Sequence, residues 1–135
     1  MEKQTHLSHR EARAIVLAVA KQMESHEQGA AVAVVDEHGE LLAFLRTDGC
    51  PLPAIDNAIN KAYTAARERQ TSWEVGQRSR VEEFPLTHFG NLRYTGCGGG
   101  APIVYNGQVV GAVGVSGLEE NEDMELANYG ASVAC

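Results

Sequence analysis

The apolar residues of the chain follow two kinds of pattern, one typical of helices and one typical of strands. The helical pattern comes first along the chain. After Ser8 and Glu11, which form an S-x-x-E capping box, apolar residues recur every three or four positions and give one apolar face. That face comprises Ala12, Ile15, Val16, Val19 and Met23. The pattern predicts a helix that begins near His9 and ends before Gly29.

Three later stretches also carry helical signals. A stripe formed largely by alanine runs through residues 55–66, and its small side chains predict close packing against a neighbouring element. A T-x-x-E capping box at Thr71 and Glu74 predicts a shorter helix after it. An acid-rich stretch then predicts the start of a last helix, because carboxylates stabilise a helix N-terminus. Its apolar stripe comprises Met124, Ala127, Ala131 and Ala134.

Short apolar runs separated by turn residues predict two β-hairpins. Residues 30–35 and 41–45 flank a turn that ends at Gly39, where glycine permits a positive φ. Residues 102–105 and 109–116 flank Asn106-Gly107, a strong hairpin signal. The strands of the first pair are apolar almost throughout, which indicates a sheet covered on both faces. Since neither hairpin needs a parallel crossover, the order of elements predicts an α+β fold, with a mainly antiparallel sheet flanked by helices.

Composition is that of one folded domain over residues 1–135, with 44% apolar and 21% charged residues. The net charge of −7 and the absence of a basic run argue against nucleic-acid binding and against an anionic membrane surface. No apolar run approaches the roughly 20 residues that span a bilayer, and the polar N-terminus lacks a signal-peptide core. Three widely spaced cysteines, Cys50, Cys97 and Cys135, suit reduced thiols. We therefore expect a cytoplasmic protein with no nucleic-acid or membrane partner.

Two long signatures resemble the GlcG/HbpS-like family. The stretch AVAVVDEHGELLAFLRTDGCPLPAIDNAINKAYTAA resembles the first, and GCGGGAPIVYNGQVVGAVGVSG resembles the second. With the first helix, the match covers nearly the whole chain. The resemblance implies a profilin-like sandwich that assembles into homo-oligomers. It also implies relatives that bind haem and relatives fused to PduO-type cobalamin adenosyltransferases, so haem or cobalamin is the cofactor to expect.

The glycine-rich loop that ends at Gly98, Gly99 and Gly100 is the most informative local feature. Consecutive glycines let backbone N–H groups approach a ligand, and such a concavity suits haem propionates, corrinoid amides or a small carboxylate. The loop lacks the Gly-Lys-Ser/Thr ending of a P-loop, which argues against a nucleoside triphosphate. The alternative is a tight turn before a buried strand.

Of the five histidines, His88 lies in the irregular segment before the glycine loop, where we expect a pocket wall. A neutral imidazole is a competent axial ligand for haem iron or cobalt, so His88 is the candidate metal ligand. No HxxxH or HExxH spacing supports another kind of histidine metal site. The alternative for each histidine is a surface or structural role, as for His26 near the end of the first helix.

Lys61 and Arg46 fall within the first signature, and either side chain would neutralise a ligand carboxylate. Asp36, Asp48 and Asp56 lie near enough in sequence to pair with them. Internal ion pairs between the first hairpin and the second helix are therefore the alternative.

These residues together predict an oligomeric protein that binds a small ligand, a tetrapyrrole such as haem or a corrinoid, without evident catalysis. Its pocket is expected to be apolar, with the second helix as the floor and the glycine loop at the rim. Two other functions stay open. One is an enzyme that acts on a small organic acid or aldehyde, or degrades haem, through Asp36, Lys61 or Cys97. The other is an assembly protein with a vestigial pocket.

Overall fold

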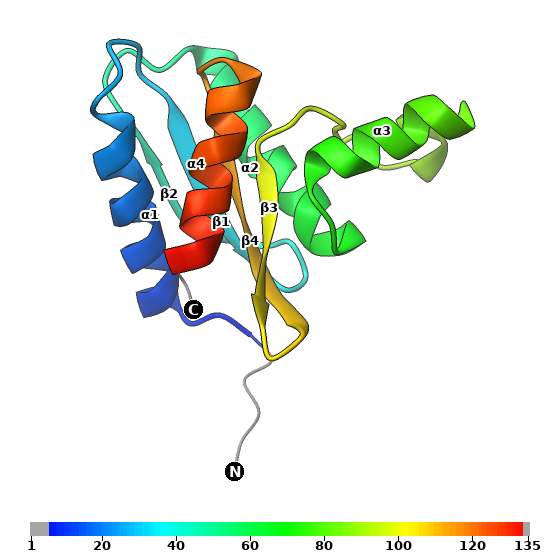
Figure 1. The fold of residues 1–135 in the computed structure, drawn as a ribbon, viewed down its shortest axis with the longest axis horizontal. Coiled ribbons are helices and arrows are strands. Elements are labelled where there is room, and N and C mark those ends of the chain that lie inside the picture. The colour runs from blue at the N-terminus through cyan, green and yellow to red at the C-terminus, as the bar shows by residue number, and fades with distance from the viewer. Residues whose placement is uncertain (1–5, 134–135) are drawn as a thin grey trace.

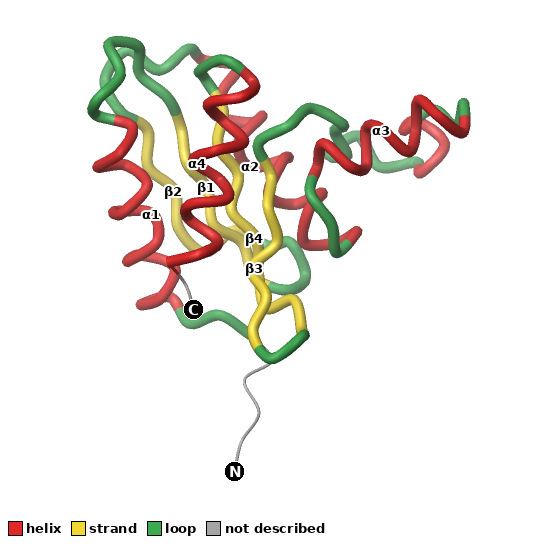
Figure 2. Tube along the Cα trace, viewed as in Figure 1, coloured by secondary structure: helices red, strands yellow, loops and turns green. Residues whose placement is uncertain are grey.

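The computed structural model, which describes residues 6–133, contains the predicted elements in the predicted order (Figures 1 and 2). They are α1 (His9–Met23), β1 (Ala31–Asp36), β2 (Leu41–Arg46), α2 (Leu52–Glu68), α3 (Ser72–Glu82), the 3-10 turn η1 (Leu86–Phe89), β3 (Gly100–Tyr105), β4 (Gln108–Ser116) and α4 (Glu120–Val133). Ala134 and Cys135 lie outside the described residues.

The sheet has the strand order β2-β1-β4-β3, and every neighbouring pair is antiparallel. Its two hairpins turn where the sequence predicts. Gly39 adopts a φ of 91°, and Asn106 and Gly107 adopt φ values of 50° and 77°, as a two-residue type I′ turn requires. The predicted α+β class is confirmed.

Helices cover both faces of the sheet, with α1 and α4 on one face and α2 on the other (Figure 1). Successive side chains of a strand point to opposite faces, so β1 contributes to two cores. Val32 and Val34 pack with the larger side chains of α1 and α4, whereas Ala31 and Ala33 face α2. Helices therefore cover both faces of the sheet as predicted, and the central strands β1 and β4 are buried almost throughout, whereas the edge strand β2 is only half-buried.

The alanine face of α2 lies unusually close to the sheet. A Cβ atom built at Gly114 would lie 2.0 Å from the Ala58 carbonyl oxygen, and one at Gly100 would lie 2.2 Å from the Lys61 carbonyl oxygen. Glycine is required at both positions because the backbone of the helix occupies the space of a side chain. The face of α2 that was expected to floor a ligand pocket is instead filled by the sheet.

Helix α3 and the irregular segment that follows it project away from the sheet, and we call them the arm (Figure 1). The capping box of α3 at Thr71 and Glu74 is formed as predicted. The base of this arm is fixed by backbone contact, since a Cβ at Gly76 would lie 2.1 Å from the Gly96 carbonyl oxygen. In the described part of the chain, no helix is both long and apolar enough to cross a bilayer.

Candidate functional site

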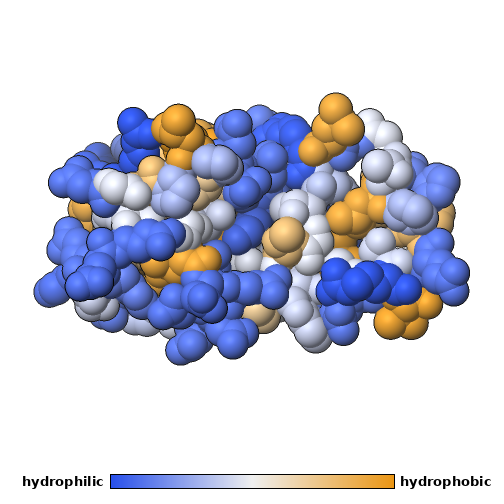
Figure 3. Space-filling view, turned by 90° about the horizontal axis from the view of Figure 1, so that it is seen from above, coloured by the Kyte–Doolittle hydropathy of each residue, from blue (hydrophilic) through white to orange (hydrophobic). Residues whose placement is uncertain are grey.

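An apolar pocket lies on the arm, between α3 and η1. On α3 the lining residues are spaced at helical intervals: Val75, Arg78, Ser79 and Glu82. They face Phe84, Leu86 and Phe89. The pocket has a volume of about 400 Å³, within the range of roughly 300–1,000 Å³ typical of small-molecule sites. Figure 3 shows apolar surface at this end of the molecule, on the right, among hydrophilic residues.

Aromatic rings form a continuous series from this pocket to α2. The Phe84 ring lies 4.8 Å from the His88 ring and 5.8 Å from the Phe89 ring, measured between centroids. Phe89 is 4.9 Å from Tyr94, and Tyr94 is 6.0 Å from Tyr63 of α2. Edge-to-face and tilted ring pairs of this kind hold irregular backbone in place. The exposed imidazole of His88 therefore lies against Phe84, one of the residues that line the pocket.

A buried ion pair joins α2 to α4 beside the glycine loop. The Lys61 Nζ atom lies 3.2 Å from Asp123 Oδ2 and donates a hydrogen bond of 3.0 Å to the Val115 carbonyl. Both side chains are almost fully buried, at 6% and 4% exposure. Burial raises the pKa of the Asp123 carboxyl to about 6, although the Lys61 charge lowers it. The second oxygen of Asp123 accepts from the Leu118 N–H.

This pairing corrects the expectation for Lys61, whose partner is Asp123 rather than Asp36, Asp48 or Asp56. The Asp36 carboxylate instead closes the β1–β2 turn, where its Oδ1 atom accepts from two backbone N–H groups. Lys61 pairs with Asp123 because its side chain extends to the end of β4, close to the start of α4, which carries Asp123.

Gly98, Gly99 and Gly100 are buried, and their neighbourhood is fully packed. The Gly98 N–H donates to Glu120 Oε2 at 2.7 Å, and the Gly100 N–H donates to Ser72 Oγ at 2.8 Å. A Cβ at Gly99, whose φ is 129°, would lie 3.0 Å from Lys61 Nζ. At Gly98 and Gly100 the N–H groups therefore point to internal acceptors, where the sequence predicted a ligand.

Arg46 lies away from the other candidate residues. Arg46 is the last residue of β2, and Gly100 is the first residue of β3. These are the two edge strands of the sheet, and β1 and β4 lie between them. Three strand spacings amount to about 14 Å. Arg46 lines a different pocket of about 400 Å³, together with His26 and Asp48. His26 there lies 3.6 Å from Glu122 of α4 and so has a partner in its own region.

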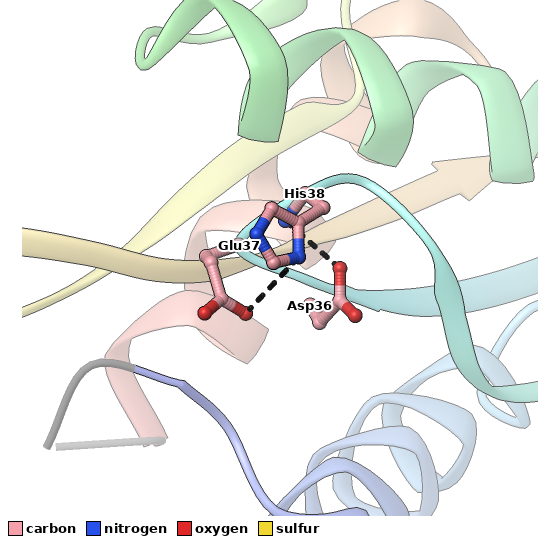
Figure 4. A group of neighbouring side chains, drawn as sticks. All are labelled: Asp36, Glu37 and His38. Carbon is pink, nitrogen blue, oxygen red and sulfur yellow. Dashed lines mark hydrogen bonds and ion pairs between the residues drawn. The ribbon is translucent and has the colours of Figure 1, made fainter.

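A carboxylate and imidazole group occupies the β1–β2 turn (Figure 4). The ligand atoms of Asp36, Glu37 and His38 lie within 4.8 Å of one another. However, Asp36 is engaged with the turn backbone, and His38 Nδ1 is 4.0 Å from Glu37 Oε1. The closeness of these three groups follows from their consecutive positions in a tight turn, which the Asp36 side chain closes.

The structure thus brings Lys61 and the three glycines together and leaves Arg46 and His88 elsewhere. The sequence did not identify Asp123 as the partner of Lys61, because Asp123 lies among several acidic residues and nothing in the sequence distinguishes one from another. It also missed Arg78 and Phe84, which line the apolar pocket. The spacing of Val75, Arg78, Ser79 and Glu82 on one helical face was the available signal.

Comparison with known proteins agrees with this architecture. A family model described as "Haem degrading protein HbpS-like" matches residues 7–132. Protein GlcG of Escherichia coli (strain K12) is 34% identical over 116 residues, which cover 86% of this chain and 85% of that protein. The structure of Klebsiella pneumoniae protein ORFY has a TM-score of 0.89 at 28% identity and covers 98% of this chain and 94% of that chain. A double mutant of HbpS from Streptomyces reticuli has a TM-score of 0.86 at 29% identity, covering 98% and 90%. The resemblance seen in the sequence is confirmed, and the chain belongs to the HbpS-like family.

Proposed function

We propose that this protein binds haem in the pocket between α3 and η1. The observation that carries the proposal is an apolar, aromatic pocket of about 400 Å³ beside an exposed imidazole. Val75, Phe84, Leu86 and Phe89 offer apolar walls to a macrocycle, two of them aromatic. The description of the family as haem-degrading and HbpS-like supports the same ligand.

We assign the axial iron ligand to His88. A neutral imidazole nitrogen is a common haem ligand, and the His88 ring lies 4.8 Å from that of Phe84, which lines the pocket. His38, by contrast, lies in the β1–β2 turn, and His26 lies beside Glu122. His88 thus combines exposure with an aromatic neighbour that lines the pocket, which neither His26 nor His38 does.

The remaining residues of the predicted site act indirectly in this proposal. Lys61 and Gly98–Gly100 fix the start of β3 against α2 and α4, through the ion pair with Asp123 and the bond to Glu120. Arg46 has no contact with haem in the α3–η1 pocket. The description of the family as haem-degrading favours haem over a corrinoid as the ligand.

We also propose that the protein works as a homo-oligomer in the cytoplasm. Large apolar side chains remain exposed on the arm, with Val81 at 78% and Leu92 at 95% exposure. Contact between chains in an oligomer would bury these side chains. Light scattering after size-exclusion chromatography tests the assembly, and a purely monomeric protein at micromolar concentration would contradict it.

The test of haem binding is an absorbance titration of the purified protein with haemin, run in parallel with hydroxocobalamin. We expect a sharp, shifted Soret band that saturates near one haem per chain. His88→Ala should change the position of the band and weaken binding, because the iron loses its imidazole. The matched control is His38→Ala, which removes an exposed histidine outside the pocket and should leave the titration unchanged.

The outcomes separate the two parts of the proposal. No saturable change with haemin would overturn haem binding. Saturable binding with identical spectra for the wild type and His88→Ala would overturn the ligand assignment alone. The location is tested by Phe84→Ala, which removes a wall of the pocket, against Leu41→Ala, which removes an equally exposed apolar side chain of β2 outside the pocket.

Haem degradation is a second candidate function, favoured by the description of the family. It differs from simple binding in that the ligand is consumed. With peroxide supplied, a degrading protein makes the Soret band disappear faster than free haemin or an unrelated haem protein does. A stable band would leave binding as the function.

A further inference from the structure

The wall of the pocket that α3 provides carries one cation among the described lining residues, Arg78. This side chain projects from the same helical face as Val75 and Glu82, which lie three and four residues away. Its side chain is 43% exposed, so the guanidinium group is accessible from the pocket mouth. An apolar pocket with a single accessible cation is suited to a ligand that has an apolar body and a negative group.

Arg78 already has a carboxylate partner in this structure. Its Nη2 atom donates a hydrogen bond of 3.0 Å to Glu68 Oε1. The other oxygen of Glu68 accepts a bond of 2.8 Å from the Tyr94 hydroxyl. Burial, together with the bond to Glu68, raises the pKa of Tyr94 to about 12, so this hydroxyl keeps its proton. If the bond from Arg78 is broken, Glu68 therefore still accepts the hydrogen bond from the Tyr94 hydroxyl.

We propose that the pocket selects apolar ligands that carry a carboxylate, and that Arg78 exchanges Glu68 for the carboxylate of the ligand. This inference rests on the pocket assigned above to haem, whose propionates are carboxylates of this kind. The new ion pair replaces the one with Glu68, so the loss of Glu68 offsets part, and not all, of the free energy gained from the ligand carboxylate. Burial of the ligand body against Val75, Phe84 and Phe89 then drives binding.

The other polar groups of the pocket set the orientation of the ligand. Ser79 Oγ donates to the Phe84 carbonyl at 2.7 Å, so its proton is engaged. Glu82 lies one helical turn beyond Arg78 and repels an anion at that end. The carboxylate of the ligand is thereby directed to the end of the pocket where Arg78 meets Glu68.

The experiment compares haemin with its dimethyl ester, in which both propionates are esterified and uncharged. Dissociation constants are measured by absorbance titration for the wild type and for Arg78→Gln. We expect the wild type to bind haemin about tenfold more tightly than the ester, the effect of one charge-assisted hydrogen bond near the surface. Arg78→Gln should bind both forms with similar affinity.

Two further variants separate ligand recognition from a structural role. Arg80→Gln removes a charge from the same helix, at a side chain bonded to Gln77 outside the pocket, and should keep the tenfold preference. Glu68→Gln removes the competing charge while it keeps a group that can bond to Tyr94. It should strengthen haemin binding about threefold without a similar gain for the ester. A residue with a purely structural role would not produce that gain.

Each outcome decides between the proposals. Equal affinity of the wild type for both probes, or an unchanged preference in Arg78→Gln, would overturn the exchange and leave haem binding intact. Failure of both probes to bind would overturn the pocket as the haem site, and the exchange with it. Circular dichroism and a urea midpoint close to those of the wild type establish that Arg78→Gln is folded. Arg78→Lys, which keeps the charge, should retain part of the preference.

Discussion

Removal of the Lys61 charge should destabilise the fold by a large fraction of its total stability. In Lys61→Met the buried Asp123 carboxylate, at 4% exposure, keeps the Leu118 N–H but loses the ammonium group 3.2 Å away. Breaking a buried pair from one side costs about 3–5 kcal/mol. Domains of this size have unfolding free energies of roughly 5–15 kcal/mol, so the change is readily measured.

The matched variant removes both charges. In Lys61→Met/Asp123→Asn the amide oxygen still accepts from Leu118, and no charge is left buried. We expect this double variant to regain about 2 kcal/mol relative to Lys61→Met alone, because a buried charge without a partner is the main source of the loss. The single variant should therefore be the less stable of the two.

The assay is urea unfolding followed by circular dichroism, at pH 7.5 and at pH 5. At pH 5 the Asp123 carboxyl of Lys61→Met takes up a proton, because burial without Lys61 favours the neutral form still more. The deficit of Lys61→Met should accordingly shrink at the lower pH. A deficit below about 1 kcal/mol at pH 7.5, or a double variant no more stable than the single one, would show that the unpaired Asp123 charge is not the main source of the loss.

Three other predictions concern stability. Because the pKa of Asp123 is raised to about 6, the native state binds this proton more tightly than the unfolded state. The wild type should therefore gain about 1.4 kcal/mol relative to Asp123→Asn between pH 7.5 and pH 5, in paired urea titrations, whereas a constant difference would contradict it. Gly114→Ala should lower the unfolding free energy by about 3 kcal/mol, since its Cβ would lie 2.0 Å from the Ala58 carbonyl oxygen; an unchanged urea midpoint would count against this close packing. Ser8→Ala should cost about 1 kcal/mol by removing the capping box with Glu11, a loss visible in the thermal midpoint; no change would show that the cap is dispensable.

The fold was predictable because its signals are local. Capping boxes at Ser8 and Thr71 mark helix starts, and Asn106-Gly107 marks a hairpin, each within a few residues of the structure it produces. The alanine stripe of α2 likewise predicted close packing, which the contact between Ala58 and Gly114 confirms. Such patterns act through neighbours in sequence, so a single chain is enough to interpret them.

The candidate site was less predictable because its contacts are long-range. Lys61 and Asp123 are 62 positions apart, and nothing in the acid-rich stretch distinguishes Asp123 from its neighbours. The glycines were interpreted as a ligand cradle, but glycine also serves where another backbone or side chain approaches closely. Gly98 is such a case, since its Cβ would lie 2.5 Å from Met124 Sδ. Only the packed structure distinguishes these two uses.

The α3–η1 pocket was hidden for a different reason. Its walls come from one face of a mainly polar helix and from the irregular segment that follows it, where no periodicity links Phe84, Leu86 and Phe89. His88 was nevertheless placed near a pocket wall from its position in that irregular segment. The structure places its ring next to Phe84.

The most direct test of the account is to map the bound ligand by NMR, using gallium protoporphyrin as a diamagnetic substitute for haem. Amide shifts of the 15N-labelled protein are followed during the titration. We expect the largest changes at Val75, Ser79, Phe84 and Phe89, which line the α3–η1 pocket. Changes centred instead on Gly98–Gly100 and Lys61, or on Arg46, would contradict it and place the ligand elsewhere on the domain.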